Sequence, residues 1–479
     1  MYIAGNYRLV MMVVLFVVSA WCLGQQNLWA EKRPASVDVR DYGQEQAIID
    51  AIVKKSHVTD NHNYPNELDH ILAALIRRAY PTPKTKDLVQ GTVGALCKEA
   101  ESRGKITIPK SRRQAWETTV AKTKSFESVL GDMETMVAKK ATRKDLVDTG
   151  LVAMLQATGC RHANVFSGAE AEWIMKLFEA NTKPSKEFGL LGVGVSRWPA
   201  IQVLPNTSAA KAGMQNGDVM LRIDSQEAKT MKTGADALKI LRGPANTTID
   251  LTVKRGDKTL TFKVRRAPMA ERIDALAIQP DVIFILIPTF EGSGIAKRVK
   301  ELVNKHVTDA TSCVILDLRN NMGGRVEEVN GVADIFLDDK NLKIYQFANG
   351  RQIAFRSKPG ASKVPILVLT NRHTGCGAEM LAMALRDNRR ATILGERTAG
   401  LLSGYDFEKL KDGRMVVFRS EPTVLSPTGK DYSETGISPD IEVKDDSLAI
   451  GSHEVIARAL QLVRTLKKKD ATRADETLK

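Results

Sequence analysis

CVILDLRNNMGG, residues 313–324, is the stretch of this chain that decides the fold. Its opening run, Cys313–Leu318, has the length and the apolar, β-branched content of a buried strand. The run ends in a polar loop with paired glycines, Gly323 and Gly324, and a helical pattern then continues through Ile335. A strand that leads through a loop into a helix is the repeating unit of a parallel sheet covered by helices.

The same alternation extends on both sides of this stretch, over residues 270–445. Further strands are predicted at Val282–Pro288, Pro365–Thr370 and Ala391–Leu394, and further helices at Gly294–His306 and Glu379–Asp387. This order predicts a largely parallel sheet. In such sheets, chemistry gathers in the loops beyond the carboxyl ends of the strands.

Two loops at that edge carry candidate catalytic groups. The turn at Gly323 and Gly324 allows backbone N–H groups to point at a ligand, as an oxyanion hole requires. The second loop carries Cys376 at the start of the helix that follows the strand 365–370. The partial positive charge of a helix N-terminus favours a thiolate, and the N–H of Gly377 is also placed to stabilise an oxyanion. The two loops therefore predict an acyl-transfer site.

Residues 187–267 consist of short β-type runs broken by glycines. The stretch SAAKAGMQNGDVMLRID, residues 208–224, resembles a PDZ domain, and Gly256-Asp257 is a hairpin signal. The alternative interpretation is a β-sandwich with ordinary turn glycines. In PDZ domains, a glycine-rich loop binds a C-terminal carboxylate and the adjoining strand edge pairs with the peptide. The resemblance assigns that loop to Leu191, Gly192, Val193 and Gly194.

The ends of the chain predict export and a helical N-terminal region. Residues 1–30 read as a signal peptide, with Arg8 before an apolar run of signal-peptide length and a small residue, Ala30, at the expected cleavage point. The alternative is an uncleaved N-terminal anchor. Export predicts a periplasmic or secreted protein with no stable membrane span after signal removal.

Helical spacing dominates residues 31–180, after a polar lead-in at 31–45 that we expect to be flexible. Residues 446–479 predict an amphipathic helix followed by a charged tail.

Composition limits the classes of partner. The 479 residues carry a formal net charge of +14, which is compatible with association with an anionic envelope. The basic residues are scattered without interleaved aromatics or zinc-finger spacing, so nucleic-acid recognition is not expected. The histidines form no metal-ligand pattern such as HExxH, and we expect no metal and no cofactor. A bridge between Cys97 and Cys160 is left open, whereas Cys313 is predicted to be a small core residue.

Four blocks in fixed order resemble the C-terminal processing (tail-specific) peptidases, which are PDZ-containing enzymes with a Ser/Lys dyad. The blocks are the PDZ unit, VILDLRNNMGG, TGCGAEMLAMALRDNRRATILGERTAG and SPTG…TGISPDIEV, and the resemblance covers roughly residues 140–445. It implies a multidomain α+β protein: a helical N-terminal region, a PDZ domain and an α/β peptidase core of the ClpP/crotonase type. It also implies that protein or peptide C-termini are the binding partners.

The resemblance assigns roles to individual residues. It implies a nucleophile at Cys376, an acidic supporting residue at Asp387, and oxyanion donors at Gly323, Gly324 and Gly377. Cys376 is itself a departure, because the family has a serine there. The chain departs at two further positions: Leu401 stands where the family has its lysine, and Tyr405 where a glutamine is expected.

Two hypotheses follow from these departures. In the first, the chain is an endopeptidase with Cys376 as nucleophile, because a thiol needs less activation than a hydroxyl. His373 would act as base or acid if its ring folds back, or would be a solvated loop residue. In the second, apolar Leu401 marks a catalytically inactive pseudopeptidase that binds protein C-termini as an adaptor or regulator. A third class is a non-proteolytic acyl-transfer or ligand-binding role on the same scaffold.

Overall fold

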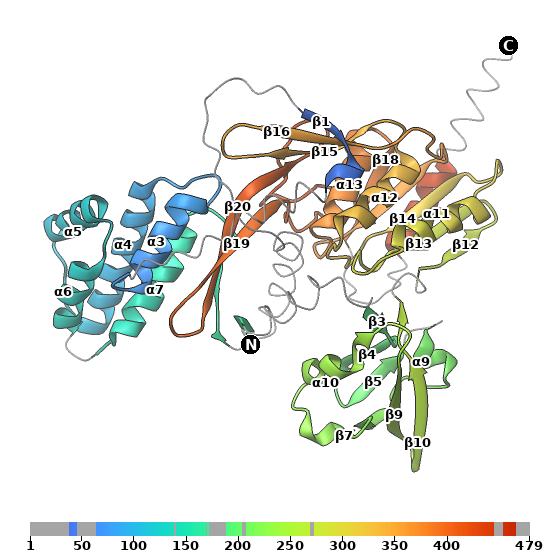
Figure 1. Cartoon of the computed structure of the whole chain (residues 1–479), viewed down its shortest axis with the longest axis horizontal. Helices are drawn as coiled ribbons and strands as arrows, with labels where there is room; N and C mark the ends of the chain where they lie inside the picture. The colour runs from blue at the N-terminus through green and yellow to red at the C-terminus, as the bar shows by residue number, and fades with distance from the viewer. Residues whose placement is uncertain are drawn as a thin grey trace.

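The computed structural model describes residues 38–45, 64–137, 140–168, 170–171, 188–203, 207–268, 273–444 and 454–465. The predicted signal peptide and the charged end of the tail lie outside these residues. A helical region, a PDZ-like unit and an α/β core are distinct in Figure 1, with the helical region and the PDZ-like unit projecting from the core. This arrangement confirms the predicted mixed α and β fold class.

The core is built on a sheet with the strand order β12-β13-β14-β17-β18-β21. Its strands are β12 (Ala275–Gln279), β13 (Val282–Leu286), β14 (Cys313–Asp317), β17 (Ile366–Thr370), β18 (Ala391–Gly395) and β21 (Ile441–Glu442). The strands from β13 to β21 run parallel, and only β12 is antiparallel to its neighbour. The four strands predicted from apolar runs are therefore confirmed, and their carboxyl ends share one edge.

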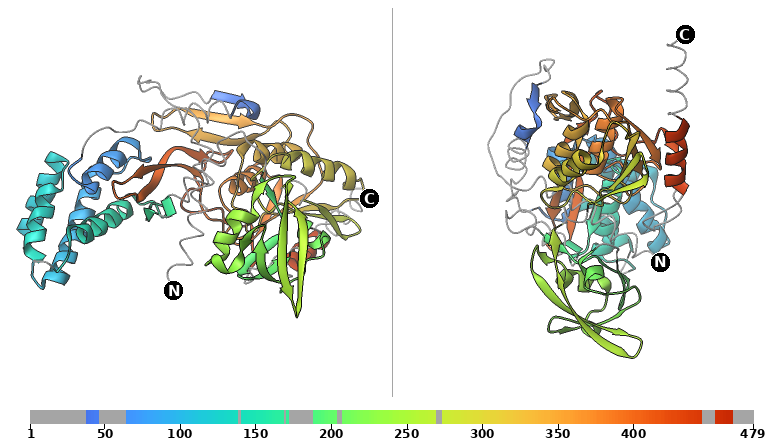
Figure 2. Two further views of the ribbon diagram at one scale, coloured as in Figure 1. Left: turned by 60° about the horizontal axis from the view of Figure 1, so that its bottom comes forward. Right: turned by 90° about the vertical axis from the view of Figure 1, so that its right-hand side faces the viewer.

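Alternate residues of each strand face opposite sides of this sheet. Val314 and Leu316 pack with the helices α11 (Ile295–His306), α12 (Val326–Phe336) and α13 (Gly377–Asp387). Ile315 packs on the other side with the helical residues 454–465. Figure 2 shows that helix as the separate red element flanking the core. Because both faces are covered, the strands are apolar throughout rather than alternating.

A second sheet packs against α13 and was not predicted. Its order is β1-β16-β15-β20-β19, with β2 also paired to β20. Its strands are β1 (Asp38–Asp41), β2 (Asn164–Phe166), β15 (Asn341–Gln346), β16 (Gln352–Arg356), β19 (Ser403–Lys409) and β20 (Met415–Leu425).

The expectation of a flexible lead-in is wrong for residues 38–45. β1 pairs in parallel with β16, and a short 3-10 turn, Tyr42–Gln44, then leads to Glu45, whose side chain is buried. The segment is ordered because β16 offers it a strand edge and the interior offers ionic partners to Glu45.

The helical region forms its own hydrophobic core. Its helices are α3 (Glu67–Arg78), α4 (Thr85–Gly104), α5 (Lys110–Thr123), α6 (Glu127–Val137) and α7 (Arg143–Gln156). Three residues of the β19–β20 hairpin, Leu410, Val416 and Phe418, are buried in the same cluster as the helices. The hairpin therefore serves both the helical core and the second sheet.

The PDZ-like unit has a five-stranded path, β10-β9-β6-β5-β4. Its elements include β4 (Val193–Arg197), β5 (Ala200–Val203), β6 (Val219–Ile223), α10 (Gly234–Leu241), β9 (Thr248–Arg255) and β10 (Lys258–Arg265). The predicted hairpin connects β9 and β10. β4 is the edge strand of this path.

The four described cysteines, Cys97, Cys160, Cys313 and Cys376, are free thiols, so the bridge left open for Cys97 and Cys160 is not formed. Cys313 is buried in the core, as predicted. Within the described residues, the search for a helix long and apolar enough to span a membrane finds none.

Candidate functional site

Cys376 sits at the N-terminus of α13, at the edge where β14 and β17 end. Its backbone φ is +52°, which is unusual for a residue other than glycine and characteristic of a sharp strand-to-helix turn. Thr374 holds this turn in place, because its hydroxyl donates to the carbonyl of Leu318 at 2.9 Å and accepts from the N–H of Asn371 at 3.0 Å. The thiol is 2% exposed.

The glycine turn after β14 packs directly against this thiol. A Cβ on Gly323 would lie 2.9 Å from Cβ of Cys376 and 2.6 Å from the nitrogen of Gly377. Gly323 also has a φ of +95°, so the close approach and the backbone conformation both require glycine. Buried Asn321 fixes the turn, since its side chain donates to the carbonyl of Ile287 at 2.8 Å.

The geometry separates the two glycines that were predicted as oxyanion donors. The N–H of Gly323 donates to Oδ1 of Asn321 at 2.8 Å, so it is already engaged. The N–H groups of Gly324 and Gly377 instead act on the Cys376 sulfur as hydrogen-bond donors. The two donors reach the sulfur from different elements, so both lie where they can donate to an oxyanion formed on a carbonyl carbon bonded to that sulfur.

Burial sets the protonation of the thiol. Burial raises the pKa of Cys376, against the N–H of Gly377, the N–H of Gly324 and the ammonium group of Lys343, all of which lower it. The N–H of Gly377 lowers the pKa, in the direction predicted for a helix N-terminus, but desolvation by burial is the larger effect and the net shift is upward.

Glu379 is a site residue whose role was not predicted. Its buried carboxylate accepts from the N–H groups of Cys376 (3.0 Å), Gly400 (2.7 Å) and Leu401 (2.7 Å). The hydroxyl of Thr398 donates to the same carboxylate. Glu379 lies three residues after Cys376, the N-cap of α13, which is the spacing of a helix capping box. That spacing is the sequence signal that could have identified it. Glu379 therefore connects the start of α13 to the loop that replaces the lysine loop of the family.

Leu401 fills the lysine position with an apolar side chain that is 1% exposed. A Cβ on Gly375 would lie 3.2 Å from Cδ1 of Leu401, so the leucine packs beside the residue that precedes the thiol. Tyr405, at the expected glutamine position, is also buried, and its ring meets His162 edge-on with 6.3 Å between centroids. This side of the thiol carries apolar and aromatic groups in place of the polar pair.

Asp387 lies at the other end of α13 from Cys376. The eleven residues of this helix span about 16 Å, so its carboxylate is far from the sulfur. There it pairs with Arg386 at 3.0 Å and accepts a hydrogen bond from Tyr432 at 3.3 Å. The structure does not bring this predicted site residue to the thiol.

His373 is half-buried in the turn before Cys376. Its N–H donates to Oδ1 of Asn371 at 3.1 Å, and the imidazole is not among the principal groups that shift the pKa of Cys376. The structure therefore gives no support to its predicted role as base or acid.

The predicted peptide-binding loop begins the PDZ-like sheet. Gly192 has a φ of +84°, and buried Leu191 accepts a hydrogen bond at its carbonyl from the N–H of Ala209 at 2.9 Å. Val193 and Gly194 open the edge strand β4, and α10 packs against this strand. An edge strand beside a helix is the geometry in which PDZ domains bind an extended peptide.

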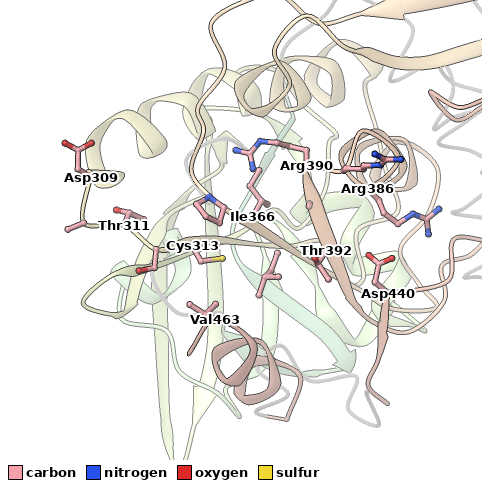
Figure 3. Close-up of a pocket in the computed structure, with 15 residues that line it drawn as sticks. Asp309, Thr311, Cys313, Ile366, Arg386, Arg390, Thr392, Asp440 and Val463 are labelled. Atoms are coloured by element: carbon pink, nitrogen blue, oxygen red, sulfur yellow. The ribbon is translucent and has the colours of Figure 1, made fainter. Parts of the chain in front are cut away.

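A pocket of about 780 Å³ lies at the opposite edge of the core sheet. It opens where β14, β17 and β18 begin, beside Cys313, Ile366 and Thr392, and three arginines line it (Figure 3). Because Cys376 lies beyond the other ends of these strands, this pocket does not serve the thiol. Across the described residues, no group of histidine, cysteine and acidic side chains is placed to hold a metal ion.

Comparisons with known proteins fit this geometry. Residues 281–443 match the sequence model "Peptidase family S41", and residues 201–255 match "PDZ domain". A carboxy-terminal-processing protease of Bartonella bacilliformis is 30% identical over 270 residues, which cover 54% of this chain and 62% of that protein. The chloroplastic carboxyl-terminal-processing peptidase 2 of Arabidopsis thaliana is 29% identical over 257 residues, 50% of this chain and 48% of that protein.

The chain thus spans between about half and three-fifths of the length of these curated relatives. Among solved structures, the photosystem II D1 C-terminal processing protease aligns over 77% of this chain and 96% of its own, at 20% identity and a TM-score of 0.38. The sequence matches confirm the predicted resemblance to PDZ-containing C-terminal processing peptidases.

Proposed function

Since residues 281–443 match peptidase family S41 and residues 201–255 match a PDZ domain, we propose that this chain is an endopeptidase that cleaves near the C-termini of protein substrates with Cys376 as nucleophile. The observation that carries the proposal is the convergence of two N–H groups, from Gly324 and Gly377, on the sulfur at the start of α13. Each group comes from a separate turn, and each turn is fixed by buried hydrogen bonds.

The reaction follows from this placement. The thiol gives its proton to water, and the sulfur adds to the scissile carbonyl carbon to give a tetrahedral oxyanion. The N–H groups of Gly324 and Gly377 stabilise that oxyanion, a type of stabilisation whose loss typically costs about 10²–10³ in kcat. The leaving amine takes up a proton from water as the C–N bond breaks, which leaves a thioester on Cys376. Water then hydrolyses the thioester and restores the thiol.

The PDZ-like unit would supply the preference for C-termini. Backbone amides of the loop formed by Leu191, Gly192, Val193 and Gly194 would bind the terminal carboxylate. The substrate tail would pair with the open edge of β4. Binding the tail at this unit raises the effective concentration of the adjoining segment at the thiol, which favours cleavage near the C-terminus.

The test is cleavage of unstructured proteins with apolar tails by the purified chain, with Cys376→Ala as the control. We expect new C-termini only with the unsubstituted chain. If neither protein cuts while both bind the tail peptides, the peptidase proposal fails.

A second candidate, a C-terminus-binding adaptor without catalysis, is favoured by one observation: Leu401 packs where the family has its lysine. Cys313 allows the two to be separated, because it is a second buried thiol, on β14, that lies outside the candidate site. A mild electrophile at neutral pH should label Cys376 stoichiometrically and spare Cys313 if the site is a working nucleophile. Equal inertness of both thiols would support the adaptor.

A further inference from the structure

A buried polar cluster lies beside the thiol and has no counterpart among the predicted motifs. It consists of Glu45 after the 3-10 turn, Asn330 on α12, and Lys343 and Tyr345 on β15. Nζ of Lys343 lies 2.7 Å from Oδ1 of Asn330 and 3.0 Å from Oε2 of Glu45. Nδ2 of Asn330 donates to the same carboxylate at 2.6 Å, and the Tyr345 hydroxyl donates to Oε1. Lys343 is 1% exposed and Glu45 is 2% exposed.

The cluster is close to the oxyanion site. Val329, the neighbour of Asn330, packs on Gly377, since a Cβ there would lie 2.8 Å from Cγ2 of Val329. β15, which carries Lys343, packs against α13, which begins at Gly377. Burial lowers the pKa of Lys343, while the carboxylate of Glu45 and, to a smaller extent, the Cys376 sulfur raise it. The ammonium of Lys343 in turn lowers the pKa of the thiol.

Stability alone does not account for a buried ion pair. Removing a lysine and a carboxylate from water is costly, and apolar residues of similar volume are often as stable or more so. The thiol also lacks the positive charge of the family's lysine, because the apolar side chain of Leu401 stands at that position. The titratable groups around the sulfur are Glu379 on α13, Lys343 and Tyr345 on β15, and Glu45. Glu327 on α12 acts on Lys343.

We propose that Lys343 is the cation that stabilises the thiolate of Cys376 in place of the missing loop lysine, and that Glu45 and Asn330 position it. The inference rests on the proposed function, because it concerns the activation of the same sulfur. The step is ionisation alone: the S–H bond breaks, the proton leaves to solvent, and the ammonium lowers the free energy of the thiolate. Glu45 offsets part of this effect by its opposite charge.

The experiment measures the pH midpoint of alkylation at Cys376 by iodoacetamide in the full chain. Mass spectrometry of the tryptic peptide His373–Arg386 separates this thiol from the others. We expect Lys343→Met to move the midpoint upward by about one pH unit, as the loss of a nearby opposite charge does. We expect Glu45→Gln to move it downward. A packing defect that merely exposed the sulfur would lower the midpoint in both variants.

A double variant keeps the test decisive if Lys343→Met fails to fold because it leaves Glu45 unpaired. Glu45→Gln and Glu45→Gln/Lys343→Met differ only in the lysine charge, and the double variant should have the higher midpoint. Equal midpoints in that pair, or a downward shift in Lys343→Met, would overturn the inference.

Peptide cleavage by the unsubstituted chain distinguishes this failure from failure of the proposed function. If the unsubstituted chain cleaves peptides but the pH midpoint of alkylation is the same with and without Lys343, the inference fails and the proposed function stands. A midpoint that follows Lys343 in a chain that cuts nothing supports the inference and removes the peptidase.

Discussion

The two sides of Cys376 differ in the chemical groups that they present to the sulfur. On one side, the turn of Gly323 and Gly324 and the start of α13 present N–H groups to the sulfur and keep their polar function. On the other side, the loop through Leu401 presents an apolar side chain. Glu379 accepts hydrogen bonds from both sides and holds the second loop in place although the lysine is absent.

The difference shows that such a site can keep its backbone geometry while it loses the side chain that serves as general base. The loop through Leu401 is held by hydrogen bonds from its backbone N–H groups to Glu379. A change of the side chain at position 401 therefore leaves the backbone of the loop in place. A donor such as the N–H of Gly324 cannot be removed in this way, because it belongs to the main chain. Oxyanion geometry is thus harder to lose than a general base.

Glu379→Ala should have the largest effect, because Glu379 is the link between the two sides. It leaves three N–H groups and one hydroxyl without an acceptor in a buried place, and each such group costs about 1–3 kcal/mol. We expect a loss of at least about 4 kcal/mol in the free energy of unfolding, measured by urea denaturation followed by circular dichroism. Glu301→Ala on the exposed face of α11 is the matched control and should change it by less than about 0.5 kcal/mol. Equal stability of the two variants would show that the loop is held by other contacts.

Gly324→Ala tests the polar side. The added Cβ would lie 2.1 Å from the carbonyl carbon of Phe290, so the turn must shift and carry its N–H away from the sulfur. We expect kcat for a tail substrate to fall on the order of 100-fold, with a much smaller change in KM. Gly131→Ala on α6, where a Cβ meets nothing within 4 Å, should leave both constants unchanged. A fall confined to KM would mean that this turn binds substrate without stabilising the oxyanion.

Leu401→Lys tests the apolar side by restoring the charge. We expect alkylation of Cys376 at neutral pH to rise about tenfold, because a lysine there would lower the thiol pKa by about one unit. Leu401→Met, which keeps the apolar volume, should leave the rate unchanged. The sharper form uses Cys376→Ser, which should be inactive alone and should regain cleavage when it is combined with Leu401→Lys. No gain in either background would show that this loop no longer faces the nucleophile.

Asp387→Asn should have the smallest effect, since about 16 Å of helix separates this carboxylate from the sulfur. We expect kcat/KM for a tail substrate to change by less than about threefold. A tenfold loss with an unchanged melting temperature would mean that the helix transmits its charge to the thiol.

The elements of the core sheet were predictable because they are buried on both faces. Runs such as Val314–Leu316 are wholly apolar, and each is followed by a helical pattern. The second sheet was not predicted because its strands pair with partners that are distant in the sequence. Such pairing leaves no local pattern of apolar residues. β1 is a polar segment, and its partner β16 lies some three hundred residues later in the chain.

The same distinction between local and long-range patterns separates the site residues that were predicted from those that were not. Cys376, Gly324 and Gly377 stand in local motifs, so their meeting followed from the order of the strands. Asp387 was assigned from the resemblance alone, and the structure places it at the end of α13 that is far from the thiol. Lys343 and Glu45 pair across distant segments, and no local pattern marks a contact of that kind.

The shared hairpin β19–β20 determines how this protein can be divided for study. Leu410, Val416 and Phe418 fill the helical core, while the same two strands complete the sheet that covers the peptidase core. A fragment cut between the helices and the core would leave these side chains in water on one piece and an unfilled interior in the other. The helices are therefore part of the cooperative folding unit of the core, and truncated forms should be handled as destabilised proteins rather than as isolated domains.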